Sequence, residues 1–291
     1  MPFIQAREVK LHYVEHGSGD NIVIFIHGYL GCGEWMDLIW PRLPRDIHVY
    51  AIDWRGCGES EKPAIIGDFE NYSLKQHAQD MINVIKALGI SKCSLATHST
   101  GGLISTHMLL AEPELFEKVI ALDPVSPKGL QIPGDFRTFF QILKEKRNFA
   151  FKTLAFVAPA LFIQESLAPG KKVEFKSETT TQQKDLFNLI VDRARIVSDG
   201  AGVGTPFHLQ KERDTGTLAK EAQQIKHHHL VLWGEDDMLI SRNDMEEMTK
   251  LLPNCRLQII KGAGHALMIE YPDLYARIFV EYFNETQASE T

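Results

Sequence analysis

Short apolar segments rich in β-branched residues alternate along the chain with longer segments in which apolar residues recur at helical spacing. Short apolar runs of this kind are typical of strands buried on both faces of a sheet. The pattern predicts strands over residues 9–13, 22–26, 48–52, 93–96, 119–122, 230–233 and 257–260, with the alternating segment 9–13 at a sheet edge. It predicts helices over residues 34–43, 74–88, 102–110, 242–252 and 273–283. Strands that alternate with helices indicate an α/β fold with a mainly parallel sheet.

The alternation stops over residues 126–225, which contain no clear strand and many phenylalanines. A segment of this length does not stay structureless inside a compact domain. We therefore predict a mainly helical lid inserted into a core of residues 1–125 and 226–291. The phenylalanines form a small core of their own or line a substrate pocket, or both. The glycine-rich segment 199–204 follows no strand, so we expect a loop or hinge there and no phosphate site.

Charge, cysteine content and the length of apolar stretches limit the expected partners and the expected location of the protein. The chain has 31 basic and 38 acidic residues and no block of lysines or arginines, which excludes a nucleic-acid backbone as the expected partner. The N-terminus shows no signal-peptide pattern, and the four cysteines lack metal-ligand or redox spacing, so we expect a cytoplasmic protein. The longest uncharged apolar stretch, residues 153–164, is too short to span a bilayer.

A candidate nucleophile follows the predicted strand 93–96. Ser99 lies in the sequence THSTGG (residues 97–102), directly before a predicted helix. A serine on such a tight strand-to-helix turn exposes its hydroxyl next to the unpaired N–H groups of the helix. Thr97 stands where the G-x-S-x-G pattern has its first glycine. A serine before two glycines is by itself more typical of a helix cap, so the remaining motifs decide its role.

A nucleophilic serine needs a base and a group that orients the base. His265 follows the predicted strand 257–260 in the glycine-rich loop KGAGH, and we identify it as the base. Asp237 follows the predicted strand 230–233, and the turn at Gly234 should bring its side chain toward the histidine loop. Asp123, at the end of the predicted strand 119–122, is the alternative acid.

A run of histidines enters the predicted strand 230–233 and could suggest a metal site. Because strand alternation sends neighbouring side chains to opposite faces, we predict no metal site at His227, His228 and His229.

The loop HGYLG (residues 27–31) follows the buried strand 22–26. Its glycines let the backbone approach a substrate, so we expect the N–H groups of Tyr29 and Thr100 to form an oxyanion hole. Tyr29, Trp35 and His98 are candidate substrate-binding residues, and packing beside the site is the alternative for each of them.

Five motifs in this order, HGYLG, DWRGCGES (residues 53–60), THSTGG, WGEDD (residues 233–237) and GAGH (residues 262–265), resemble the α/β-hydrolase superfamily. The resemblance extends over residues 9–283. It implies an eight-stranded, mostly parallel sheet, a Ser-Asp-His triad, a pocket between sheet and lid, and no cofactor or metal. Thr97 is the one departure at a motif position.

The resemblance implies a hydrolase acting on a small molecule through an acyl-enzyme on Ser99, with a small to medium, largely apolar ester or lactone as the expected substrate. The same triad also serves carbon–carbon bond hydrolases, amidases, hydroxynitrile lyases and slow-turnover ligand receptors, and fold does not choose among them. Serine at position 99 argues against the dehalogenase and epoxide hydrolase branches, which use aspartate as nucleophile. The oligomeric state stays open.

Overall fold

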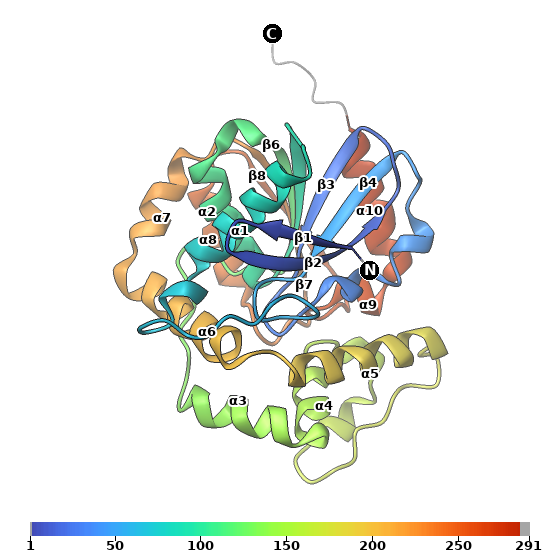
Figure 1. Cartoon of the computed structure of the whole chain (residues 1–291). Helices are drawn as coiled ribbons and strands as arrows, with labels where there is room; N and C mark the ends of the chain where they lie inside the picture. Colours follow the sequence, from blue (N-terminus) through green and yellow to red (C-terminus); the bar gives the residue numbers. More distant parts are fainter. Residues whose placement is uncertain (1, 286–291) are drawn as a thin grey trace.

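A single eight-stranded sheet organises the chain in the computed structural model, which describes residues 2–285. The strands are β1 (Phe3–Ala6), β2 (Val9–His16), β3 (Asn21–Ile26), β4 (Ile47–Ile52), β5 (Cys93–His98), β6 (Phe116–Leu122), β7 (His228–Gly234) and β8 (Cys255–Ile260). Their order in the sheet is β1-β2-β4-β3-β5-β6-β7-β8. All neighbours from β4 to β8 pair in parallel, and β1 and β2 join antiparallel. The predicted α/β class and strand number are confirmed (Figure 1).

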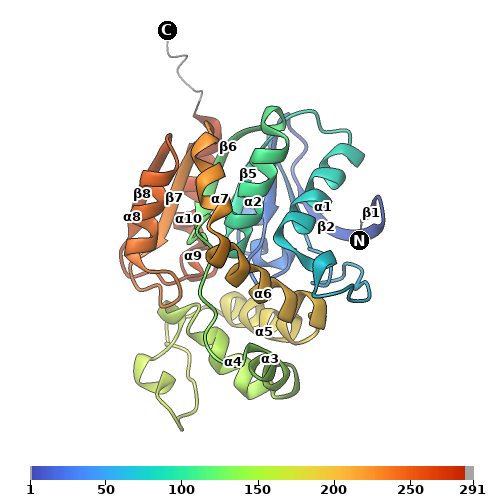
Figure 2. The ribbon, with the colours of Figure 1, turned by 90° about the vertical axis from the view of Figure 1, so that its left-hand side faces the viewer.

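Helices cover both faces of this sheet. Figures 1 and 2 show α1 (Leu74–Ala87) and α2 (Thr100–Ala111) on one face and α10 (Pro272–Asn284) on the other. The remaining helices of the C-terminal part are α8 (Arg242–Leu251) and the short α9 (Leu267–Glu270). Helix α1 begins after Ser73, whose side chain accepts a hydrogen bond from the backbone N–H of Gln76. Such a cap satisfies one of the N–H groups that a helix leaves free at its start.

Two short 3-10 helices, η1 (Gly33–Met36) and η2 (Trp40–Arg42), replace the helix that we predicted over residues 34–43. That prediction was wrong because Pro41 has no N–H to donate and disfavours helical backbone at the residue before it. The short strand β1 was missed. Four residues with alternating exposure at a sheet edge give too weak a pattern to recognise from sequence.

Between β6 and β7 the chain forms five α-helices and three short 3-10 helices within the described residues. The α-helices are α3 (Phe136–Glu145), α4 (Arg147–Ala155), α5 (Thr181–Arg195), α6 (Asp199–Thr215) and α7 (Thr217–Glu221). Helices α3, α4 and α5 lie together at one end of the sheet, apart from the helices that cover its faces (Figures 1 and 2). Phe151, Phe162, Phe175 and Phe187 contact one another with ring centroids 4.5 to 5.9 Å apart. This helical segment therefore has an aromatic core of its own.

The glycine-rich segment 199–204 forms the first turns of α6, so our prediction of a loop was wrong. A Cβ atom at Gly200 would lie 2.1 Å from the ring of Tyr72, and one at Gly202 would lie 1.9 Å from the ring of Phe140. The glycines thus let α6 approach two aromatic rings closely. Contacts with residues distant in sequence outweigh the low helix propensity of glycine, which sequence reasoning took as the sign of a loop.

Candidate active site

Ser99 lies on the turn between β5 and α2, in a backbone conformation that residues other than glycine rarely adopt. Its φ is 53° and its ψ is −120°. Such a conformation persists only where surrounding contacts hold it. The Ser99 N–H donates to the Leu122 carbonyl at 2.9 Å, and the Ser99 carbonyl accepts from the N–H groups of Gly102 at 3.0 Å and Val125 at 2.9 Å. The turn is therefore fixed from both sides, and Ser99 keeps 9% of its surface exposed.

Thr97 occupies the position where the family pattern has glycine. It is fully buried in β5 and pairs in regular parallel register with Ile26 on one side and Ala121 on the other. Its Oγ1 has no hydrogen-bond partner among residues 2–285. The threonine is thus accommodated inside the strand, two residues before Ser99, without a shift of register at this position.

His265 and Asp237 form a buried hydrogen-bonded pair. The distance from His265 Nδ1 to Asp237 Oδ2 is 2.7 Å, and the two side chains are 3% and 0% exposed. The second carboxylate oxygen of Asp237 accepts from the N–H groups of Leu239 at 2.7 Å and Ile240 at 3.2 Å. Because a carboxylate accepts, Nδ1 carries the proton and Nε2 is left free to take one. This is the tautomer that a general base requires.

The histidine loop lies directly against the serine turn, although no hydrogen bond joins Ser99 Oγ to His265 among the described contacts. The ring of His98, the neighbour of Ser99, lies 4.8 Å from the ring of His265. His98 Nε2 donates to the His265 carbonyl at 2.7 Å. Burial, and then the nearby His265, hold the pKa of His98 well below its usual value, so this imidazole stays neutral. His98 thus supports the backbone of the candidate base.

Asp123 lies at the end of β6 beside this pair without contacting the histidine by a hydrogen bond. Its Oδ1 accepts from the Gly234 N–H at 2.8 Å. One side-chain oxygen or nitrogen atom from each of Asp123, Asp237 and His265 lies within 4.8 Å of the other two. Burial, and then the charge of Asp237, raise the pKa of Asp123 well above its usual value. A carboxyl group that keeps its proton stabilises an imidazolium poorly, so the geometry favours Asp237 over Asp123 as the acid.

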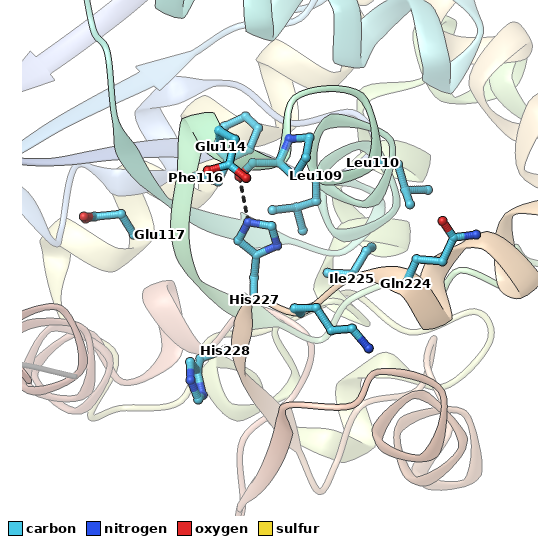
Figure 3. Close-up of a pocket in the computed structure, with 11 residues that line it drawn as sticks. Leu109, Leu110, Glu114, Phe116, Glu117, Gln224, Ile225, His227 and His228 are labelled. Carbon is cyan, nitrogen blue, oxygen red and sulfur yellow. Dashed lines mark hydrogen bonds between the residues drawn. The ribbon is translucent and has the colours of Figure 1, made fainter. Parts of the chain in front are cut away.

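The run His227–His229 does not assemble a metal site with other side chains among the described residues. His227 Nε2 bonds to the Pro113 carbonyl at 2.9 Å, and His229 Nδ1 bonds to the His227 carbonyl at 2.9 Å. Figure 3 shows His227 and His228 pointing in different directions, in a pocket that Glu114 and Gln224 also line. The side chains thus diverge as strand alternation predicts.

The loop of residues 27–31, here named the oxyanion loop after its predicted role, passes over the serine turn at close range. A Cβ atom at Gly28 would lie 2.9 Å from both His98 Nδ1 and Ser99 Cβ, so only glycine lets the loop come this near. The Tyr29 N–H donates to no main-chain carbonyl among the described residues. Thr100 is the first residue of α2, where a helix supplies no acceptor for the N–H. Both predicted donors are therefore available.

The candidate substrate-binding residues have different surroundings. Trp35 is 3% exposed and packs in an apolar cluster. The other residues of this cluster are Leu154, Val157, Ala158, Phe187, Ile190, Ala266 and Ile269, and the narrow space between them has no room for a water molecule. Because Ala266 follows His265, the cluster adjoins the histidine loop. The Tyr29 hydroxyl instead donates to the Gly202 carbonyl of α6 at 2.5 Å.

Glu270 is a buried carboxyl group that sequence reasoning missed. Its two oxygens accept from the Gly264 N–H at 2.7 Å and from the Ala160 N–H at 2.8 Å, so it joins the histidine loop to the helical segment. Burial raises its pKa to about 7, and the charges of Asp237 and Asp236 add to this effect. Its place directly after four apolar residues, 266–269, was the one sign that this acid would be buried.

Within residues 2–285, no helix is both long and apolar enough to cross a membrane.

Comparison with known proteins agrees with this architecture. Epoxide hydrolase 4 of Mus musculus is 27% identical over 95% of this chain and 77% of its own length. An esterase from Exiguobacterium antarcticum matches with a TM-score of 0.77 and 21% identity, over 97% of this chain and 99% of that one. An enol-lactonase from Burkholderia xenovorans matches with a TM-score of 0.74 and 18% identity, over 98% of this chain and 100% of that one.

A family model described as alpha/beta hydrolase fold matches residues 21–272. Together with the relatives, this match supports a hydrolytic enzyme. Because the model spans most of the sequence, the chain belongs to the α/β-hydrolase fold family.

Proposed function

We propose that the protein is a serine hydrolase that cleaves a small to medium, largely apolar ester or lactone through an acyl-enzyme on Ser99. The observation that carries this proposal is the buried pair of His265 and Asp237, which leaves Nε2 of the histidine free beside the serine turn. A base in the correct tautomer next to a serine on a strained turn suits acyl transfer.

The proposed reaction uses two acyl-transfer steps. His265 Nε2 removes the Ser99 proton as Oγ attacks the carbonyl carbon, and the resulting oxyanion accepts hydrogen bonds from the N–H groups of Tyr29 and Thr100. Asp237 stabilises the imidazolium. The alcohol leaves with the proton from His265, and the acyl group stays on Ser99. Water then gives its proton to His265, attacks the ester and releases the acid, and the proton returns to Ser99.

The substrate class follows from the surroundings of the candidate triad. The side chains clustered around Trp35 next to the histidine loop are apolar, which favours an apolar acyl group. Serine at position 99 separates this chain from the aspartate-dependent chemistry of the epoxide hydrolase branch, although an epoxide hydrolase is among its relatives. We also propose that residues 126–225 act as a lid over a core of residues 1–125 and 226–291.

The test is hydrolysis of p-nitrophenyl esters of increasing acyl length by the wild type and by Ser99→Ala, with fluorophosphonate labelling and peptide mapping. We expect labelling at Ser99 and a loss of about a thousandfold or more in the variant. Ser105→Ala is the matched control, because Ser105 is a buried serine of α2 whose hydroxyl donates to the Gly102 carbonyl. A fully active Ser99→Ala enzyme would contradict the proposal. Labelling without ester turnover would favour a carbon–carbon hydrolase, lyase or receptor.

A further inference from the structure

The oxyanion loop has a side-chain contact with the helical segment. The Tyr29 hydroxyl donates to the main-chain carbonyl of Gly202 in α6 at 2.5 Å. The Tyr29 ring also contacts Phe136 of α3, with centroids 5.8 Å apart. Burial raises the pKa of Tyr29 well above its usual value, so the hydroxyl keeps its proton and remains a donor. One side chain of the loop that carries a predicted oxyanion donor is therefore fixed by two helices of the segment between β6 and β7.

A proline explains why this carbonyl is available. In an α-helix the carbonyl of residue 202 accepts from the N–H of residue 206. Residue 206 is proline, inside α6, and proline has no N–H to donate. Its ring also crowds the carbonyl four residues before it. Gly202 thus presents a buried carbonyl without the donor four residues ahead that a helix normally supplies, and the Tyr29 hydroxyl donates to it instead.

Helix α6 is itself fixed to the sheet-bearing part of the molecule. The N–H of Ser198 donates to the Gly56 carbonyl at 2.8 Å, and His208 Nε2 bonds to the Phe69 carbonyl at 3.0 Å. The carbonyl of Gly202 lies between these two attachments along the chain. The Gly202 carbonyl is therefore held in place relative to the sheet, and it holds the Tyr29 hydroxyl that donates to it.

We propose that Tyr29 is a positioning residue that aligns the oxyanion loop through the α6 carbonyl left free by Pro206. This inference rests on the proposed function, because it assigns a role to the N–H of the same residue in binding the oxyanion. The hydroxyl end of the side chain is held by α6, and the backbone end lies one residue after Gly28, which touches the serine turn. Docking of the helical segment and alignment of the oxyanion donor are thereby linked.

The test is a double-mutant cycle of Tyr29→Phe and Pro206→Ala, measured by ester kinetics and by the affinity of a boronic acid that forms a tetrahedral adduct with serine. Tyr29→Phe removes the hydroxyl alone, and we expect kcat to fall about tenfold with KM unchanged. Pro206→Ala supplies an N–H that competes for the Gly202 carbonyl, and we expect a smaller loss of the same kind. The double variant should lose no more than Tyr29→Phe alone.

Tyr72→Phe is the matched control. Its hydroxyl donates to the Pro63 carbonyl at 2.6 Å and its ring also contacts α6, but it lies outside the oxyanion loop. We expect Tyr72→Phe to leave kcat and boronate affinity unchanged. Equal effects of the two Tyr→Phe changes, or additive losses in the double variant, would overturn the inference.

The outcome separates this inference from the proposed function. If the wild type turns over esters and labels at Ser99 while Tyr29→Phe keeps full kcat, only the inference fails. If the wild type does neither, the proposed function fails, and hydrogen exchange in residues 27–31 becomes the readout. We then expect faster exchange in Tyr29→Phe and Pro206→Ala than in Tyr72→Phe, and equal exchange in all three would refute the link.

Discussion

The sheet and the helical segment of residues 136–221 are held in place by different kinds of contact. The strands that present Ser99, Asp237 and His265 are joined by main-chain ladders with one register shift, at the start of β5, and all six residues of β5 are buried. The helical segment contacts the rest of the molecule through isolated hydrogen bonds, such as those from Gln183 Nε2 to the Ile269 carbonyl and from the Ser198 N–H to the Gly56 carbonyl. A single substitution can therefore remove a contact of the segment while the ladders stay intact. The sheet and the helical segment can thus be perturbed one at a time.

The largest effect on activity should come from a substitution of Asp237, the proposed acid, which a strand of the sheet presents. We expect Asp237→Asn to lower kcat by about a thousandfold to ten-thousandfold, since an amide can hold His265 in the wrong tautomer. Asp123→Asn should cost far less activity, because Asp123 contacts Gly234 and not the histidine. The measurement is kcat/KM for the best ester of the panel. A greater loss in Asp123→Asn than in Asp237→Asn would reverse the assignment of the acid.

A substitution of Phe187 tests the helical segment in the same way that Asp237→Asn tests the sheet part. Its ring is 2% exposed and lies 4.9 Å from Phe162, so Phe187→Ala should cost about 3–5 kcal/mol locally. We expect native-state hydrogen exchange to show this loss in α4 and α5 but not in β5. Phe25→Ala, a fully buried change in β3, is the matched control and should speed exchange throughout the sheet. Equal exchange profiles for the two variants would mean that sheet and segment unfold as one unit.

A substitution of Glu270, which joins the two regions, should give the smallest effect, a change in how the free energy of unfolding depends on pH. Its pKa of about 7 in the folded state lies above the ordinary value of 4.5, so the stability it contributes is present below about pH 4.5 and is lost as the pH rises through about 7. That change amounts to about 3 kcal/mol. We expect Glu270→Gln to remove this part of the pH dependence of the free energy of unfolding, measured in urea.

The exposed Glu235 of the neighbouring loop provides the control for this experiment. Water solvates an exposed carboxylate in both states, so Glu235→Gln should leave the pH profile as it is in the wild type. An unchanged profile in Glu270→Gln would show that Glu270 does not titrate in this window.

Sequence reasoning succeeded where the pattern depends on local periodicity. The buried strands were recognised because apolar runs such as residues 22–26 are short and bounded by turns. Ser99, Asp237 and His265 could be named as candidates because each follows a strand, and parallel strands end at one edge of a sheet. The structure brings the aspartate and histidine together as expected, and it places the serine turn beside them.

The sequence failed where contacts between distant residues decide the outcome. Glycines 200 and 202 predict a loop until the rings of Tyr72 and Phe140 are known to lie against them. The partners of Glu270, at positions 160 and 264, come from a short 3-10 helix of the helical segment and from the histidine loop. The role of Pro206 depends equally on Tyr29, which lies far away in the chain. No local pattern contains this information.

The order of the strands also sets the order in which a working site can appear during translation. The serine turn and the oxyanion loop belong to the first part of the chain, whereas β7 and β8, which present Asp237 and His265, come after the helical segment. At about 5–20 residues per second, the ribosome makes His265 roughly ten to thirty seconds after Ser99. A nascent chain thus carries the proposed nucleophile without the proposed base for that time. On the proposed mechanism it gains reactivity only when the last two strands join the sheet.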